Sequence, residues 1–516
     1  MPFARVIALV VLGVLWTIPG VAQEVQVIEH ELDNGLTLLM VPRSGDPNIA
    51  AGWIAKVGSI YERPGITGVA HLFEHMMFKG TRTIGTRNIE EDLRIIGELD
   101  DLRRQIQAED SALLRAYALG KISDPNDPAV RTRRHGELLE AFEALLARQK
   151  ELLIKEDFSR TYTGHGASGM NAGTSYDFTI YFVNVPANKL ELWFWMESDR
   201  LLTPVFREFY SERDVVHEER RLRTDSTPIG KFQEQFEAMF WQSSPYGWPV
   251  VGWPSDLSGI TREEALAFFD VYYAPDNLVA ALVGDFDPND AVMLAERYLG
   301  RLERGATPAL PPRTREMPQL AEKRMVAYAE TNPQVVIRYH SVPDGHVDEP
   351  ALVVLGQLLS GRTGRLYKSL VEGQQVATNA SGGQSGFKFE GMFELRGTAS
   401  QGRTPEEVEA ALSAEIMRLQ NEPVEDRELQ KVKNQNGAST FRDLRGNFQL
   451  MMQLLIREGN RGWETINSDP LLYDAVTADD VMRVANKYFT PETRSVAIYY
   501  RQEREVSEDE LPPPVR

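Results

Sequence analysis

Two histidines and one glutamate lie within five consecutive residues, and their spacing suits a metal site. His71 and His75 are four residues apart, so on a helix both imidazoles project from one face and can reach one ion. Glu74 lies beside them, placed to accept a proton from a water at that ion. With 8 His and 75 acidic residues among 516, chance predicts roughly 0.02 His-x-x-acid-His matches. The segment therefore predicts a zinc centre, with hydrogen-bonded structural histidines as the alternative.

A third protein ligand is needed to complete such a centre, with a fourth position open to water. The chain has no Cys, so a carboxylate is the natural candidate. Residues 211–223 have a helical pattern in which Glu212 and Glu219 share a stripe with Val215 and Leu222. Two carboxylates on an inward stripe need compensation, which a divalent cation gives. We therefore predict Glu219 as the ligand and Glu212 as a supporting carboxylate; the alternative is an exposed charged helix.

A duplicated helix–strand unit organises the chain. Thr261 opens a helical pattern that ends in aromatics before Pro275, and Thr477 opens a similar one before Pro491, with a β-rich stretch after each. The two Thr and the two Pro are both 216 residues apart. Each Thr is a predicted N-cap with acids in the first turn. A repeat of this size indicates a duplicated domain, with chance similarity as the alternative.

The fold class that we expect is α+β, with two homologous domains, each a mostly antiparallel sheet packed with helices. The predicted boundaries are residues 23–302 for the first domain, 303–322 for a Pro-containing linker, 323–505 for the second domain and 506–516 for an acidic, Pro-rich tail. Residues 99–154 break the repeat with two long helical patterns joined by a turn. They predict a helical hairpin inserted at about 99–160 of the first domain, either a solvated protrusion or a lid or partner contact.

The N-terminal residues predict an exported protein. Arg5 precedes an apolar run, residues 6–18, with Gly20 and Ala22 after it, as in a signal peptide spanning residues 1–22. An uncleaved membrane anchor is the alternative, but the run is shorter than the ~20 residues of a spanning helix. Without Cys, a bacterial periplasm is the expected compartment, with no stable membrane anchor after cleavage.

The net charge of −19, with no basic stripe, argues against nucleic acid and anionic membrane surfaces.

A family resemblance joins these features. Residues 68–81, Gly-Val-Ala-His-Leu-Phe-Glu-His-Met-Met-Phe-Lys-Gly-Thr, resemble the zinc motif of the pitrilysin/insulinase family. Residues 212–219 are similar to the family's downstream acidic stretch. The resemblance implies one Zn²⁺ per chain, with His71, His75 and Glu219 as ligands and with Glu74 and Glu212 as catalytic carboxylates.

The resemblance also implies a way of binding peptides. Residues 171–174, Asn-Ala-Gly-Thr, resemble the family's edge strand that pairs with substrate backbone. Asn171, Ala172 and Thr174 are therefore the expected substrate contacts. The implied activity is that of a zinc metalloendopeptidase that hydrolyses short or unfolded peptides, and the alternative is a catalytically silent structural or peptide-binding relative.

Two departures from the family pattern stand out. His75 and Glu219 are 144 residues apart, roughly twice the usual gap, which the helical insertion accounts for. The family's second domain normally supplies an Arg and a Tyr, but Val371 and Thr378 stand in their places. We therefore expect this to be the zinc-bearing chain of a heterodimer whose sister chain carries the Arg/Tyr pair, with a homodimer as the alternative.

Overall fold

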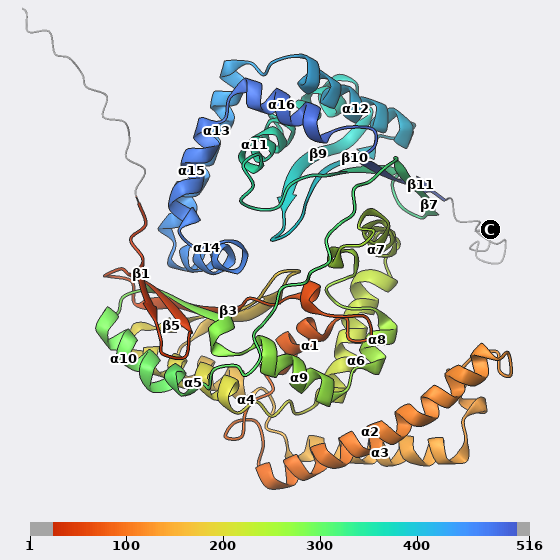
Figure 1. Cartoon of the computed structure of the whole chain (residues 1–516), viewed down its shortest axis with the longest axis vertical. Coiled ribbons are helices and arrows are strands. Elements are labelled where there is room, and N and C mark those ends of the chain that lie inside the picture. Colours follow the sequence, from red (N-terminus) through yellow and green to blue (C-terminus); the bar gives the residue numbers. More distant parts are fainter. Residues whose placement is uncertain (1–23, 503–516) are drawn as a thin grey trace, which may run out of the picture.

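The computed structural model describes residues 24–502, which form two α+β halves, one above the other in Figure 1. The first half contains a six-stranded sheet in the order β1-β2-β6-β3-β5-β4, and the second a five-stranded sheet in the order β7-β11-β8-β10-β9. Among the described strands only β2–β6 and β7–β11 pair in parallel. Two mostly antiparallel sheets packed with helices confirm the predicted fold class.

The elements of the two halves follow the same broad plan. The strands are β1 (Ile28–Glu31), β2 (Thr37–Pro42), β3 (Asn48–Ala55), β4 (Ser168–Thr174), β5 (Thr179–Pro186), β6 (Leu278–Gly284), β7 (Lys323–Ala329), β8 (Gln334–His340), β9 (Ala377–Gly386), β10 (Gly391–Ala399) and β11 (Arg494–Arg501). The helices of the first half are α1 (Val69–Met76), α2 (Ile89–Ala118), α3 (Arg133–Leu152), α4 (Asp157–Gly164), α5 (Leu190–Leu202), α6 (Phe209–Arg220), α7 (Pro228–Phe240), α8 (Pro254–Gly259), α9 (Arg262–Tyr272) and α10 (Pro288–Tyr298). Those of the second half are α11 (Glu349–Leu359), α12 (Pro405–Asn421), α13 (Asp426–Arg445), α14 (Asn447–Asn460), α15 (Thr465–Ala475) and α16 (Ala478–Tyr488).

The repeated unit found in the sequence is α9–β6 in the first half and α16–β11 in the second. Thr261 and Thr477 both cap their helices through complete capping boxes. Leu278 and Arg494, the first residues of β6 and β11, are again 216 positions apart. Each strand pairs in parallel with one neighbour and antiparallel with the other. The predicted N-caps and the duplication of the unit are confirmed.

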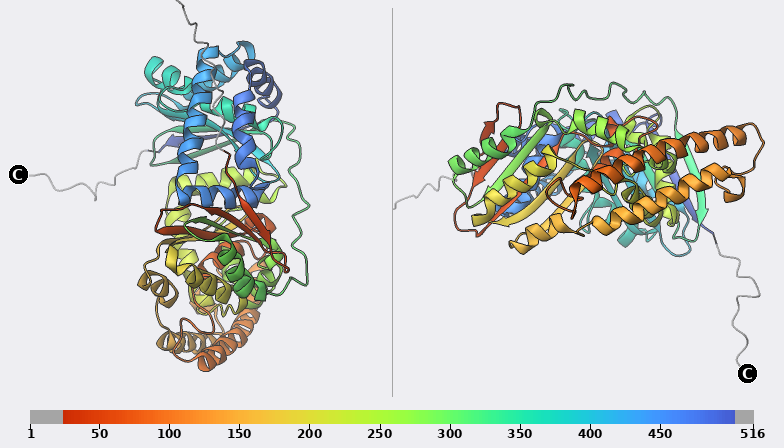
Figure 2. Two further views of the ribbon diagram at one scale, coloured as in Figure 1. Left: turned by 90° about the vertical axis from the view of Figure 1, so that its left-hand side faces the viewer. Right: turned by 90° about the horizontal axis from the view of Figure 1, so that it is seen from below.

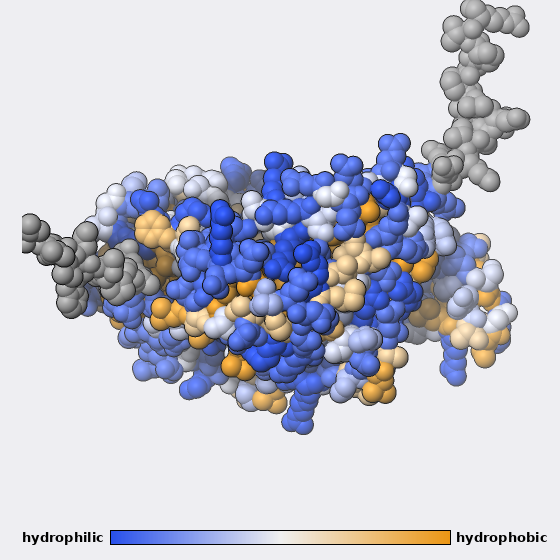
Figure 3. All heavy atoms as spheres, turned by 90° about the horizontal axis from the view of Figure 1, so that it is seen from above, coloured by the Kyte–Doolittle hydropathy of each residue, from blue (hydrophilic) through white to orange (hydrophobic). Residues whose placement is uncertain are grey.

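The connection between the halves and the chain ends complete the outline. Residues 303–322 form no helix or strand and run along one side of the molecule (Figure 2). The predicted signal peptide and the whole of the predicted tail lie outside the described residues. Within residues 24–502, no helix has the length and apolar character that crossing a membrane requires. The face shown in Figure 3 is mainly hydrophilic, with apolar side chains dispersed over it.

The predicted helical hairpin is α2–α3, which projects from the first half (Figure 1). Its bounds differ from the prediction, because α2 begins at Ile89 rather than near Leu99. Asn88 caps the helix by accepting a hydrogen bond from the Glu91 amide at 3.2 Å. The second helix of the hairpin, α3, ends at Leu152, before the predicted residue 160.

Each half contributes one helix to the sheet of the other. Helix α14 of the second half places Leu450 and Leu454 against Ala50 and Ile54 of β3, in one buried cluster. Helix α7 of the first half packs against the second sheet. The cluster between them contains Phe232 and Phe236 from α7 with Val336, Ala497 and Tyr499 from the sheet. We call α7 and α14 the exchanged helices. The two halves are therefore joined through shared cores.

Candidate metal centre

Helix α1 carries the His-x-x-Glu-His segment, and a buried carboxylate fixes where it begins. Glu62 accepts hydrogen bonds from the backbone amides of Gly68 and Ala70, both at 2.8 Å. Gly68 has φ 91°, and a Cβ there would lie 2.6 Å from the Val251 carbonyl oxygen. Only glycine meets both conditions. The N-terminus of α1 is thereby fixed before the first histidine.

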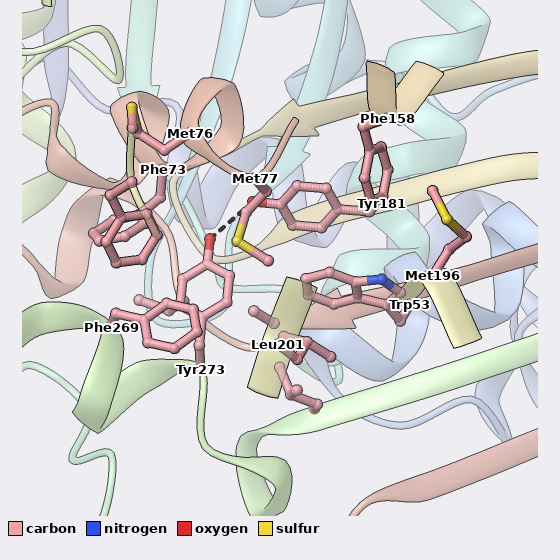
Figure 4. Packing of buried hydrophobic residues seen from close by; sticks show 14 of the residues in the cluster. Trp53, Phe73, Met76, Met77, Phe158, Tyr181, Met196, Leu201, Phe269 and Tyr273 are labelled. Atoms are coloured by element: carbon pink, nitrogen blue, oxygen red, sulfur yellow. Dashed lines mark hydrogen bonds between the residues drawn. The ribbon is translucent and has the colours of Figure 1, made fainter. Parts of the chain in front are cut away.

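Apolar residues on the opposite face of α1 fix its rotation. Leu72, Phe73 and Met76 are at most 2% exposed. The Phe73 ring packs among aromatic rings that include Phe269 and Tyr273 (Figure 4). Since these residues face the core, His71, Glu74 and His75 point away from it toward α6 and β4. The motif's apolar residues thus position its polar ones.

Helix α6 brings Glu219, the predicted third ligand, to α1. The apolar residues predicted to share its inward stripe do not face inward. Glu212 is 7% exposed, whereas Val215 is 46% and Leu222 63% exposed. The prediction that these two apolar residues face inward is wrong. Leu222 lies beyond α6, in a π-helical turn at Arg221–Asp225, where the helical phase changes.

Buried arginines hold α6 to the body together with apolar residues such as Val216. Arg213 donates to the carbonyl oxygens of Ser258 and Ile260 at 3.0 and 3.1 Å. Arg220 donates to the Gly252 carbonyl at 3.0 Å. Both arginines are at most 8% exposed. The inward face of α6 therefore mixes polar and apolar side chains, and a hydrophobic pattern does not reveal the polar ones.

Three predicted ligands meet between α1 and α6. The ligand atoms of His71, His75 and Glu219 all lie within 4.8 Å of one another. Glu219 Oε2 is 3.7 Å from His71 Nε2 and 3.3 Å from His75 Nε2. Ligand atoms bonded to one tetrahedral zinc at about 2.0–2.1 Å lie roughly 3.3–3.5 Å apart. Two imidazoles and a carboxylate at these separations fit a zinc ion.

The pKa of His71 supports ligation. Burial, with a smaller contribution from the positive charge of a protonated His75, lowers this pKa from 6.5 to about 4 against the opposing charge of Glu219. At neutral pH the His71 imidazole is therefore neutral, with a lone pair available to a metal. His217, two residues before Glu219, is not part of this group, and its Nε2 lies 3.2 Å from Ser258 Oγ.

Glu74 lies between the metal centre and strand β4. Its Oε2 accepts a hydrogen bond from Thr174 Oγ1 at 2.7 Å. Burial raises the pKa of Glu74, and the Thr174 hydrogen bond partly opposes this shift. A carboxylate with a raised pKa and a fixed orientation is suited to accept and return a proton.

Glu212 supports His75 from the other side. Its Oε2 is 3.4 Å from His75 Nδ1, and its Oε1 forms an ion pair with Lys79. Burial would raise the pKa of Glu212, but hydrogen bonds from His75 and Lys79 outweigh it and the pKa is lowered. Burial alone would lower the pKa of His75. The hydrogen bond to Glu212 and the charges of the nearby acids outweigh burial, so the pKa of His75 is raised. Carboxylates behind ligand imidazoles orient the ring and raise its basicity.

Two basic residues at the site escaped the sequence analysis. Lys79 holds Glu212, and Arg223 Nη1 lies 2.5 Å from Glu219 Oε1. Both follow a site residue by four positions, Lys79 after His75 and Arg223 after Glu219. Residues four apart are neighbours on a helix, so this spacing could have indicated from the sequence that both basic residues lie near the site.

The predicted substrate contacts lie on β4, which is an edge strand of the first sheet. Asn171 and Ala172 pair with β5 on one side only, and Thr174 pairs with Thr179. In the described part of the chain, no strand covers the other side of β4. Backbone groups along that edge are therefore available to an extended peptide.

The positions of the missing Arg and Tyr lie in the second half. Val371 is in a π-helical turn, Tyr367–Gly373, and packs against the core of that half. Thr378 is on β9, and its hydroxyl lies 3.4 Å from the Thr398 carbonyl oxygen. Neither side chain offers a guanidinium or a phenol.

Comparisons with known proteins relate both halves of the chain to domains of one peptidase family. The model of the insulinase family, peptidase family M16, matches residues 41–100, and the model of the M16 inactive domain matches residues 259–436. This chain has the domains of peptidase family M16. It is 25% identical to the zinc protease PqqE of Helicobacter pylori over 92% of this chain and 93% of that one. An uncharacterized zinc protease of Bacillus subtilis, YmxG, is 21% identical over 89% of this chain and 95% of that one.

Solved structures share the fold. A protease from Helicobacter pylori superimposes with a TM-score of 0.75 and 21% identity, over 92% of this chain and 99% of that chain. The periplasmic protease PqqL from Escherichia coli gives 0.64 and 17% identity, over 94% of this chain and 49% of that chain. The two-domain M16 fold therefore extends over nearly the whole described chain.

Proposed function

We propose that the chain is a zinc-dependent endopeptidase that hydrolyses short or unfolded peptides. The observation that carries the proposal is the convergence of His71, His75 and Glu219, with Glu74 directed between this centre and the free edge of β4. The names of the M16 relatives as zinc proteases support it. The inactive-domain match spans residues 259–436, which include none of His71, His75 and Glu219.

The protein's own residues divide the work of peptide hydrolysis. His71, His75 and Glu219 would hold the zinc, which supplies a Lewis acid that acidifies water and polarises the scissile carbonyl. Glu74 takes a proton from the attacking water and passes it to the nitrogen of the leaving amine. Thr174 holds the Glu74 carboxylate, and the edge of β4 aligns the peptide. Glu212 and Lys79 orient His75.

Substitution of Glu74 tests the proposal. Glu74→Gln keeps the shape and removes the proton acceptor, so peptide cleavage should fall by about 100- to 10,000-fold. Zinc content, measured by atomic emission, and binding of a fluorescent peptide should stay close to the parent values. Unchanged cleavage would eliminate Glu74 as the base. A parent chain that binds no zinc would instead favour the alternative, a silent structural or peptide-binding relative.

We further propose that full activity needs a second chain. Donors to the developing oxyanion are typically worth about 3 kcal/mol each, and Val371 and Thr378 provide neither of the two that the family pattern has there. A sister chain with an Arg/Tyr pair would supply them. The purified chain should therefore cleave slowly and become active on mixing with that sister chain. Full zinc-dependent activity of the isolated chain, or of its homodimer, would disprove the heterodimer.

The bacterial periplasm remains our proposed location, based on the N-terminal sequence.

A further inference from the structure

The far end of the α2–α3 hairpin has a local charge opposite to that of the chain. Residues 111–134 contain five basic residues against two acidic ones, a net charge of +3 in a chain of −19, and two of the five, Arg133 and Arg134, pair with Glu137 and Glu109 just outside this range. The basic residues are Arg115, Lys121, Arg131, Arg133 and Arg134. We call residues 111–134 the hairpin end. Whole-chain charge, on which the sequence argument against anionic membranes was based, averages over this local excess.

Most of these basic side chains are free to meet an external partner. Arg133 and Arg134 have side chains that are 93% and 68% exposed, and they lie near Glu137 and Glu109. In the described part of the chain, no ion pair holds Arg115, Lys121 or Arg131. Their positive charges therefore face solvent without internal neutralisation.

Large apolar side chains are exposed among these charges. Leu114 is 58%, Tyr117 51% and Leu119 63% exposed, in the last turn of α2 and just after it. Burying such side chains would release roughly 1.5–3 kcal/mol each in a fully apolar environment, so something that covers them would bind favourably. The combination of aliphatic, tyrosine and basic side chains is typical of segments that lie at a membrane interface.

The hairpin end is held in an ordered shape. Asp124 and Asp127 accept hydrogen bonds from the Asn126 and Ala129 amides, both at 2.8 Å. Thr132 caps α3. Both acidic residues of the hairpin end are thus engaged in folding its loop. The loop presents the basic and apolar side chains in a fixed arrangement.

The base of the hairpin is fixed to the body. Asp92 forms a fully buried ion pair with Arg207 at 2.7 Å, and Tyr210 of α6 donates to Asp100 at 2.9 Å. The hairpin runs from this base beyond one side of the first half, as Figures 1 and 2 show. Its end is therefore available to contact a surface that the rest of the molecule does not reach.

We propose that the hairpin end docks on an anionic phospholipid surface. Two helix ends and a short loop form a convex tip, which is small beside the ~800 Å² per partner of a stable protein interface. A lipid surface needs no shape complementarity, because apolar side chains enter between headgroups while basic ones meet the phosphates. Docking at this end is peripheral and reversible, and it is independent of the proposed catalysis.

Sedimentation with lipid vesicles tests the proposal on the full chain without residues 1–22. The protein should bind phosphatidylglycerol vesicles, release as salt is raised, and fail to bind phosphatidylcholine vesicles. Reversing Arg115, Lys121 and Arg131 together to Glu should weaken binding at least tenfold, since each basic residue near an anionic surface contributes about fivefold. Replacing Leu114, Tyr117 and Leu119 together by Ser should weaken it at least fivefold.

A matched control separates a local site from overall charge. Arg297, Arg304 and Arg418 have side chains that are 69%, 66% and 56% exposed, away from the hairpin. Their joint reversal to Glu changes net charge equally and should leave vesicle binding unchanged. Far-UV circular dichroism checks that every variant is folded. Equal loss in this control, no preference for phosphatidylglycerol, or binding to acidic polypeptide but not to vesicles would each overturn the proposal.

Discussion

In each half a helix packs on an edge strand of the sheet, but the residues that meet at this contact differ between the halves. In the first half, α1 packs against β4, and polar groups meet there, with Thr174 bonded to Glu74. In the second half, α11 packs against β9, and glycines meet there: a Cβ on Gly356 would lie 2.8 Å from the Gly383 Cα. Helix α11 has no His, and its one acid, Glu349, is in the first turn. One scaffold therefore serves either chemistry or close packing.

Loss of the predicted third ligand should have the largest effect on this contrast, because it breaks the His71–His75–Glu219 group, the one group of this kind among the described residues. Glu219→Gln should lower zinc affinity by about 1,000-fold or more, since an amide is a poor zinc ligand. Competition with a chromogenic chelator measures this. Glu218→Gln is the matched control, because Glu218 is exposed and paired with Arg221 at the surface. A similar loss in the control would argue against a specific role for Glu219.

Crowding the second half should act on stability instead of on metal binding. Gly356→Ala places a methyl group against the β9 backbone, so the free energy of unfolding should fall by about 2 kcal/mol, as for other overpacked cores. Chemical denaturation measures the change. A Cβ at Gly383 meets nothing within 4 Å, so Gly383→Ala should have a much smaller effect. Equal stability of the two variants would mean that α11 and β9 can separate without cost.

Removal of the Lys79 charge should have a smaller effect, confined to the first half. Lys79→Met leaves Glu212 without its ion-pair partner, and zinc affinity should fall by about tenfold, as on loss of other groups behind a ligand. Lys79→Arg keeps the charge and should restore most of the affinity. The same loss in both variants would indicate a packing role for the lysine stem.

Acidic pH should weaken the contact between the halves, and this is the smallest of the predicted effects. The ring of His340 on β8 stacks on Phe240 of α7 at 4.0 Å, and burial lowers its pKa from 6.5 to about 4. The unfolded chain therefore binds more protons between pH 6.5 and about 4, so stability is complete above pH 6.5 and falls as pH drops through that window. The loss should be about 1–2 kcal/mol, allowing for partial exposure of the ring.

Thermal unfolding across this pH range measures the effect. His340→Phe should remove this contribution to the pH dependence, whereas His165→Phe, at an exposed position, should not. An unchanged pH profile in His340→Phe would assign the acid sensitivity to other groups.

Local signals in the sequence predicted more than long-range ones. The helix with His71 and His75, the Thr caps and the 216-residue repeat each depend on residues near one another or on a direct comparison. Glu219 was also predicted, but the apolar stripe offered in its support was wrong, since Val215 and Leu222 are exposed. Buried Arg213 and Arg220 hold α6 through backbone carbonyls, and hydrophobic periodicity does not record such contacts. The exchanged helices were not predicted, because which sheet an amphipathic helix covers depends on tertiary packing.

The exchanged helices also constrain the order in which the chain becomes stable during synthesis. When the first 302 residues have been made, the β3 residues Ala50 and Ile54 still lack α14, which contains residues 447–460. One apolar face of the first sheet stays open until most of the second half has emerged. A shortened chain that ends at the linker would carry the whole zinc motif and still expose that face, and exposed apolar surface on an incomplete chain favours aggregation.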